Sequence, residues 1–261
     1  MSKKALKIID FVVYPIGAVI IIALVWHAIY LKGGSEFIFP SLSSTFKKAC
    51  GYLSDAYFWK SALNTFLRVL AAFSIAFLLA LITGILSKVF PVVGKILKPF
   101  IHITVSAPTV AFMIILNLLA VKSTVSPVLV ALTVVYPTAY ASVVAAFSKI
   151  DPKLVEMAKS YNVPLSRRIF SLYAPYVAPY IVEESGTIAS FTLKIVVSSE
   201  IIAYTYKSVG GMINQAKTYL EPDGVMALTI ISVLIALVIE GLIKGAVLIY
   251  RKCAYKEGKS L

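Results

Sequence analysis

Long apolar runs alternate with short polar segments along the whole chain. Six runs each approach or exceed the roughly 20 residues that a helix needs to cross the hydrocarbon core of a bilayer. They cover about 11–31, 62–87, 100–121, 127–147, 181–203 and 224–249. None alternates polar and apolar side chains as the strands of a membrane barrel do. The pattern therefore predicts an all-α membrane protein with six transmembrane helices in a single domain over residues 1–261.

The composition agrees with lipid as the surrounding solvent. Hydrophobic residues make up 59% of the chain and charged residues 14%, whereas soluble domains carry about 25% charged residues. The formal net charge of +13 could suggest nucleic acid as a partner. The basic residues, however, lie in short clusters between the apolar runs and form no basic face. We therefore expect the lipid bilayer, and no nucleic acid, as a partner.

The distribution of basic residues predicts the orientation of the spans. Lys and Arg are about twice as frequent in the N-terminus, the 88–99 loop, the 148–180 loop and the C-terminus as in the other connections. This predicts that both termini are cytoplasmic. The first apolar run is too long for a signal peptide, so we expect it to be retained as a helix. Cys50 and Cys253 then lie on opposite sides of the membrane and cannot pair.

The 148–180 loop contains a helix that its own sequence delimits. Asp151 is a good N-cap and Pro152 suits the first helical position. Asn162 tolerates the left-handed conformation that stops a helix. We expect a helix of about ten residues, followed by a second one from about Leu165 to Ala174 that ends at Pro175. Such a short capped helix at the cytoplasmic face suits docking of another protein, although it could equally be a connector.

The same stretch resembles the signature loop of ABC importer permeases. That signature reads E-A-A-x-x-x-G, with Pro thirteen residues later. Glu156, Ala158 and Pro175 match it, while Met157 and Asn162 stand where Ala and Gly are usual. The likeness extends over roughly residues 60–250 and is closest to the nitrate/sulfonate/taurine group. It includes the segment Asn64-Thr65-Phe66-Leu67-Arg68-Val69-Leu70, Pro108, Glu200 and Gly210-Gly211, although a usual Trp-Phe-Gly near the end of the third span is absent.

The resemblance implies a function and a set of partners. The chain would be the translocation subunit of an importer in the bacterial cytoplasmic membrane, with a short cytoplasmic coupling helix between spans 4 and 5. A cytoplasmic ATPase dimer would contact this loop, an extracytoplasmic binding protein would deliver the solute, and a second permease copy would complete the path. The solute would be small and polar, such as a sulfonate, a nitrate-like ion or a vitamin precursor. The residues implied for ATPase coupling are Glu156, Met157, Ala158, Asn162 and Pro175.

The sequence itself requires a partner for energy. It lacks the G-x-x-x-x-G-K-[ST] loop that binds ATP. Its two histidines, His27 and His102, have no carboxylate or cysteine nearby in sequence, so we expect no catalytic centre, metal or cofactor. A membrane-embedded enzyme would need clustered catalytic residues, and a stand-alone secondary transporter would need internal repeats and broken helices. The secondary transporter remains the alternative.

Ionisable and amide side chains within the predicted spans are candidates for the translocation path. Lys194 lies near the middle of the fifth span and would favour an anionic solute, and Glu200 lies towards its outer end. Arg68 could instead snorkel outward, and Asn117 could bridge helices. The candidates for the path are Lys194, Glu200, Asn117 and Arg68.

Two further patterns suggest packing within the membrane. Glu240 and Lys244 have the i,i+4 spacing of a helix ion pair. Small residues four positions apart predict smooth faces for close helix contact. They are Ala72, Ala76, Ala80 and Gly84 in the second span, and Gly241 and Gly245 in the sixth.

Overall fold

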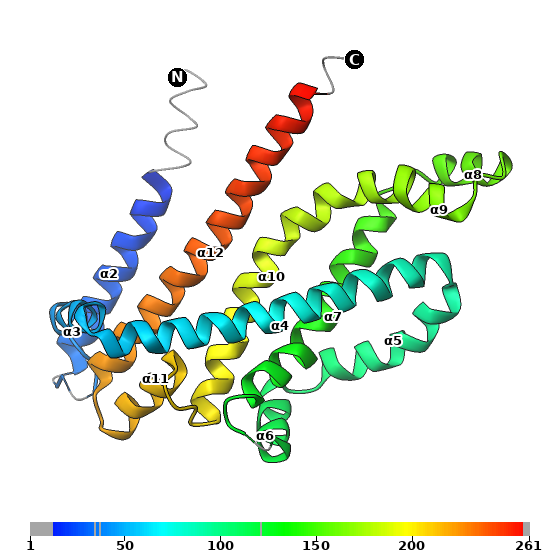
Figure 1. Ribbon diagram of the computed structural model, residues 1–261. Coiled ribbons are helices and arrows are strands. Elements are labelled where there is room, and N and C mark those ends of the chain that lie inside the picture. Colours follow the sequence, from blue (N-terminus) through cyan, green and yellow to red (C-terminus); the bar gives the residue numbers. More distant parts are fainter. Residues whose placement is uncertain (1–12, 34, 37, 121, 258–261) are drawn as a thin grey trace. The chain divides into compact units, whose positions relative to one another are not determined.

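The chain is helical throughout the part that the structure describes. The computed structural model describes residues 13–257 apart from 34, 37 and 121, and contains no strand among them; 86% of it is helical. Five helices are long and apolar enough to cross a bilayer, and a bent pair would make a sixth span. Figure 1 shows α2 (Tyr14–Gly33), α3 (Leu42–Ser54), α4 (Ala56–Val89), α5 (Pro91–Ser106), α6 (Thr109–Leu119), α7 (Ser126–Ser148), α8 (Pro152–Ser160), α9 (Leu165–Arg168), α10 (Ala174–Ile202), α11 (Val209–Thr218) and α12 (Pro222–Glu257).

The chain divides into two compact units. The smaller one comprises residues 1–59 and 212–231. Here the Trp26 indole N–H of α2 donates to the carbonyl oxygen of Pro40 at 2.9 Å, which ties α2 to the start of α3. Lys48 of α3 forms a 2.8 Å ion pair with Glu221, just before α12. Cys50 is exposed and unpaired, and the side chain of Cys253 lies outside the described part.

The larger unit, residues 60–211 and 232–261, is built around α7. α10, α6 and α5 all pack against this helix. The Tyr136 and Tyr140 hydroxyls of α7 donate to Thr83 at 3.1 Å and to Ser87 at 2.9 Å, both on α4. These hydrogen bonds fix α4 against α7.

The predicted small-residue face of the second span is a packing face. Ala72, Ala76 and Ala80 are fully buried. A Cβ at Gly84 would lie only 2.5 Å from Val143 Cγ1 of α7, so only glycine allows this approach. The corresponding prediction for the sixth span is not confirmed, because nothing described lies within 4 Å of a Cβ at Gly241 or Gly245.

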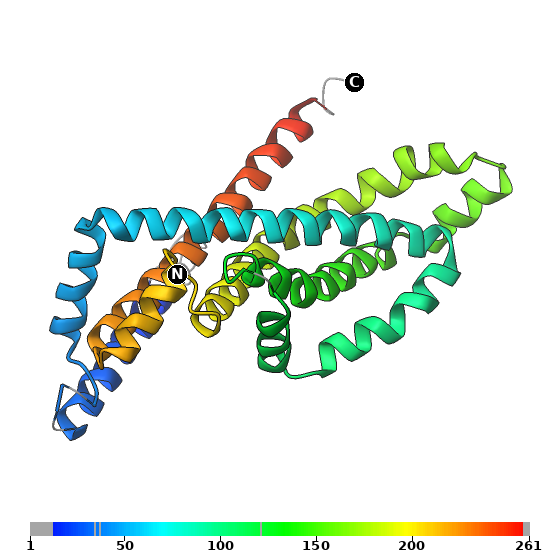
Figure 2. The ribbon, with the colours of Figure 1, turned by 60° about the horizontal axis from the view of Figure 1, so that its bottom comes forward.

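The third predicted span, 100–121, is not one continuous helix. α5 and α6 meet at an angle of 100°, and Figure 2 shows the bend between them. The break falls at Ala107, whose backbone is extended (φ −76°, ψ 144°), directly before Pro108. A proline ring disfavours the α conformation of the residue before it, so the prediction of an unbroken helix was wrong at this point.

The second helix of the long loop does not end at Pro175 either. α9 continues through a π-helical segment, η2 (Ile169–Tyr173), into α10 without a break. A proline lacks the N–H that an α-helix uses and crowds the carbonyl one turn earlier. The wider π turn directly before Pro175 relieves both problems. The helix therefore extends from the loop into the fifth span.

Candidate functional site

Helix α8 has the start that its sequence predicts. The Asp151 side chain accepts a 2.9 Å hydrogen bond from the backbone N–H of Lys153, and Pro152 occupies the first turn. Both features satisfy or remove backbone donors that would otherwise lack a partner at a helix N-terminus. The predicted beginning of the helix is confirmed.

The end of α8 is also the predicted one. Asn162 has a positive φ of 49°. The N–H of Val163 donates to the Ala158 carbonyl at 3.0 Å, and the N–H of Asn162 donates to the Lys159 carbonyl at 2.9 Å. This pair of bonds forms a Schellman motif, in which asparagine serves in place of glycine.

The faces of α8 differ in exposure. Leu154 and Val155 are half-buried and Ala158 is buried, whereas Glu156 is exposed. Two large apolar side chains also face outward, Met157 at 54% exposure and Tyr161 at 79%. Pro175, the last residue of the signature loop, is exposed at the start of α10. Exposed apolar side chains beside a charge are typical of a surface that contacts another protein.

The base of the loop is anchored in the larger unit. Phe147 at the end of α7 and Tyr173 at the end of η2 are both buried, and their rings meet edge to face at 6.0 Å. Lys149 lies over the ring of Tyr180 at 4.2 Å. α8 is thus attached to the two long helices α7 and α10, which would transmit a displacement of α8 into the larger unit.

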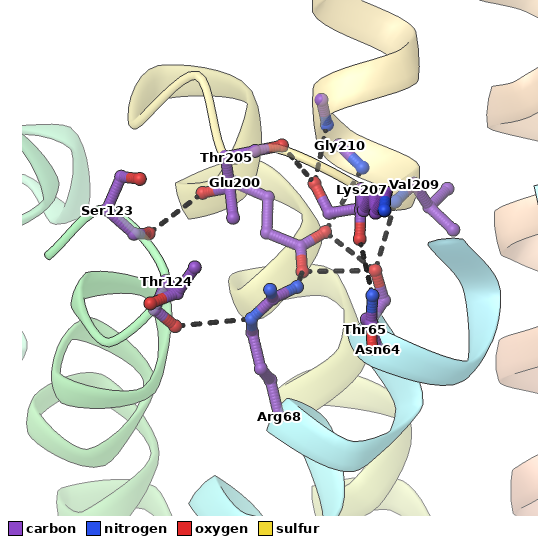
Figure 3. A network of polar contacts seen from close by, with 12 residues as sticks. Asn64, Thr65, Arg68, Ser123, Thr124, Glu200, Thr205, Lys207, Val209 and Gly210 are labelled. Atoms are coloured by element: carbon purple, nitrogen blue, oxygen red, sulfur yellow. Dashed lines mark hydrogen bonds and ion pairs between the residues drawn. The ribbon is translucent and has the colours of Figure 1, made fainter. Parts of the chain in front are cut away.

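A second constellation of polar groups lies around Glu200, near the end of α10 (Figure 3). Its carboxylate is 0% exposed and accepts a 2.8 Å hydrogen bond from Arg68 Nη1 of α4, whose side chain is 13% exposed. The Thr65 hydroxyl lies 3.0 and 2.9 Å from the two carboxylate oxygens. A buried carboxylate is tolerated only when it is paired and hydrogen-bonded in this way.

The first residues of α11 complete the coordination of Glu200. The Gly210 N–H donates to Glu200 Oε2 at 3.1 Å, and the Val209 N–H donates to Thr65 Oγ1 at 3.0 Å (Figure 3). The free N–H groups and the dipole of a helix N-terminus favour a negative charge. A Cβ on Gly210 would lie 2.4 Å from Glu200 Cβ and 2.5 Å from the Val197 carbonyl oxygen. Glycine is therefore required at this position.

Arg68 and its neighbours also hold two connecting segments. Arg68 Nε donates to the Thr124 carbonyl at 3.2 Å, and Thr205 Oγ1 donates to the Ser123 carbonyl at 3.1 Å. Asn64 Nδ2 donates to the Lys207 carbonyl at 3.1 Å. We call the set Asn64, Thr65, Arg68, Glu200, Thr205, Val209 and Gly210 the Glu200 network. It ties α4, the α6–α7 connection and the α10–α11 turn together.

The predicted path residues thus occupy different environments. Arg68 and Glu200 form one pair, so the expectation that Arg68 snorkels outward is wrong. Asn117 Oδ1 accepts a hydrogen bond from the Ser126 hydroxyl of α7, and its Nδ2 has no partner among the described residues. This bond supports the interpretation that Asn117 bridges two helices. The predicted pair Glu240–Lys244 is confirmed.

Lys194 differs from these residues. It is exposed on α10, and no hydrogen bond or ion pair joins it to another side chain in the described part of the chain. Sequence reasoning overlooked Thr65, the hydroxyl that links Glu200 to α11. Two signals were available: Thr65 lies three residues before Arg68 on the same helix face, and it belongs to the segment that resembles the permease family.

Two comparisons with known proteins return matches. The family model described as "Binding-protein-dependent transport system inner membrane component" matches residues 76–245. A solved structure described as "Crystal structure of an amino acid ABC transporter with histidines" aligns with a TM-score of 0.61 at 15% identity, over 72% of this chain and 91% of that one. At this identity the likeness shows the fold alone. None of the curated proteins matches the chain.

Proposed function

Because the chain belongs to the family of binding-protein-dependent transport system inner membrane components, and is therefore an ABC importer permease, we propose that α8 is the element through which an ATPase drives it. Two copies of the chain form the translocation unit in a bacterial cytoplasmic membrane, with both termini in the cytoplasm. An ATPase dimer binds on the cytoplasmic side, and a binding protein delivers a small polar solute from the other side.

The main support for this proposal is the structure of α8. Its two ends are fixed by local hydrogen bonds, its inner face is packed, and Glu156, Met157 and Tyr161 are exposed. A rigid helix of this kind transmits force, whereas a flexible loop would absorb it. The chain has no ATP-binding loop of its own, so the driving force must enter from a partner.

The solute is proposed to be anionic on the basis of Lys194. Lys194 is an exposed cation within a predicted span and has no counterion among the described residues. Charged residues within membranes commonly mark a solute path. Arg68, Asn117 and Glu200 remain predicted path residues. Arg68 and Glu200 already neutralise each other.

The test is to purify the complex with its ATPase after Glu156→Arg. We expect the variant to insert and fold normally, because Glu156 is exposed and makes no ion pair in the described chain. We expect it to lose the ATPase during purification, because the reversed charge opposes docking. The matched control is Glu36→Arg, which also changes an exposed carboxylate. Glu36 lies in the 32–61 connection, which is extracytoplasmic if the N-terminus is cytoplasmic. Full ATPase retention by Glu156→Arg would contradict the assignment of α8.

A further inference from the structure

One face of α10 carries polar side chains, with the half-buried Phe191 among them, although the helix is long enough to cross the membrane. Glu184, Thr187 and Lys194 are exposed, and Ser198 is half-exposed. They are separated by three, seven and four residues, a spacing that places side chains on one face of an α-helix. We call Thr187, Lys194 and Ser198 the polar stripe of α10.

Between residues 185 and 200, the other faces of α10 are largely covered by the protein. The residues between the stripe positions are mostly buried, among them Ile188, Leu193 and Val196. α10 packs chiefly against α7, and Ser190 donates to the Ala236 carbonyl of α12 at 3.0 Å. Thr187 and Lys194 are the exposed positions of α10 between residues 185 and 200, and Ser198 is half-exposed. The beginning of the helix is also open, as the exposed Tyr176 and Val182 show.

The three side chains of the stripe have no partner within the described residues. The other charges of this region differ in that respect. Glu200 is paired with Arg68, Glu240 is paired with Lys244, and Glu184 lies close enough to Lys244 to interact with its charge. The ammonium group of Lys194 is thus left without compensation.

Lys194 cannot easily place its charge at the membrane surface. Its Cα lies about two helical turns, roughly 12 Å, before the end of α10 at Ile202. Side chains in a helix lean towards its N-terminus, which for Lys194 is the direction away from that nearer end. An isolated charge at this depth is not stable in lipid. Water, a charged ligand or a counterion of a second copy must therefore face Lys194.

We propose that the polar stripe lines a water-filled path and that Lys194 there binds the negatively charged group of the transported solute. Thr187 and Ser198 supply hydroxyl donors seven residues before and four residues after it along the same face. A carboxylate, sulfonate or similar oxyanion accepts both kinds of hydrogen bond. This inference rests on the proposed function and adds to it the face of α10 that recognises the solute.

The test measures water access and charge selectivity without knowledge of the solute. Thr187→Cys and Ser198→Cys are made in a chain carrying Cys50→Ser and Cys253→Ser, and the assembled importer is placed in lipid vesicles. Each cysteine is reacted with anionic sulfonatoethyl methanethiosulfonate and with its cationic trimethylammonium analogue. We expect both positions to react, and Lys194→Gln to lower the anion-to-cation rate ratio by about tenfold, the low end of electrostatic steering.

The matched control is Val196→Cys, on the fully buried face of the same helix, which should stay unreacted. Absence of reaction at both stripe positions would overturn the proposal, because lipid or a tightly packed second copy would then cover the stripe. A disulfide between copies would identify the second case. The proposal would also be overturned if both cysteines react but Lys194→Gln leaves the anion-to-cation rate ratio unchanged. Loss of the ATPase in Glu156→Arg is a separate measurement, so failure of the stripe and failure of the proposed function are distinguishable.

Discussion

At the residue scale, two ion pairs of the described chain, Arg68–Glu200 and Lys48–Glu221, lie in opposite environments. Glu200 is fully buried and holds Arg68, Thr65 and the start of α11 at once. Lys48 and Glu221 keep 35% and 42% of their side chains exposed. Exposed pairs contribute little because water screens them, whereas a buried charge that loses its partner is strongly destabilising. The two pairs should therefore respond very differently to substitution.

Arg68→Met should lower the free energy of unfolding by about 3 kcal/mol or more, because it leaves the buried carboxylate of Glu200 without its cation. Adding Glu200→Gln should restore part of that loss, since an amide keeps an acceptor for Gly210 and carries no charge. The measurement is denaturation of the purified chain in detergent. A double variant less stable than Arg68→Met alone would show that the pair is not the dominant interaction.

Lys48→Met should change the free energy of unfolding by less than about 1 kcal/mol. The hydrogen bond to Glu221 raises the pKa of Lys48 above its usual 10.5. A raised lysine pKa stabilises the fold fully below pH 10.5, and this contribution is lost as the pH rises through the folded pKa. The difference between the wild type and Lys48→Met should therefore shrink only in strongly alkaline buffer. A difference that disappears already near neutral pH would contradict this origin.

At the element scale, two short helices depend on single backbone positions. α8 is terminated by Asn162, whose φ is 49°, and the first turn of α11 brings Gly210 into close contact with α10. In each case the backbone geometry restricts which residue fits. The restriction on Asn162 is conformational, and that on Gly210 is steric.

Asn162→Val should loosen the end of α8, because a β-branched residue in the left-handed region costs about 1–2 kcal/mol. Asn162→Gly should keep the Schellman bonds. Hydrogen exchange of the Val163 and Asn162 amides reports this directly. We expect about tenfold faster exchange in the valine variant, in line with a cost of that size, and no increase in the glycine variant. Equal exchange in both would show that the cap does not hold the helix.

Gly210→Ala should destabilise the larger unit, because the added Cβ meets Glu200 Cβ at 2.4 Å and the Val197 backbone oxygen at 2.5 Å. Neither atom is the end of a flexible side chain. Gly241→Ala is the matched control, since nothing described lies within 4 Å of its Cβ. Thermal unfolding in detergent should separate the two variants clearly. Equal stability would mean that the α11 start can shift without loss.

The accuracy of sequence-based prediction also varies among the elements. α8 is predictable because Asp151, Pro152 and Asn162 act on their immediate neighbours. The break at Ala107 carries a local signal in Pro108, but a long apolar run conceals it. At Pro175 the error is the opposite one: the sequence predicts the end of a helix, but the π turn before Pro175 allows the helix to continue. A proline thus marks a disturbance, and its surroundings decide whether the helix ends there.

At the scale of the whole molecule, the number of spans follows from composition, whereas contacts distant in sequence do not. Six apolar runs correspond to five spanning helices and one bent pair. Arg68 and Glu200 are 132 residues apart, and no pattern in the sequence pairs them. Sequence alone predicts that Lys194 is an intramembrane charge, and the fold adds that the described chain leaves its side chain exposed.

The most direct test of the account is site-specific photocrosslinking from α8 in intact cells. Met157, which is 54% exposed, is replaced by a photoreactive benzoylphenylalanine. We expect a crosslinked product that contains the permease and a cytoplasmic ATP-hydrolysing subunit. Two results would contradict this assignment of α8. Residue 157 could fail to crosslink to such a subunit while the cells still import solute, or it could react with a reagent confined to the cell exterior.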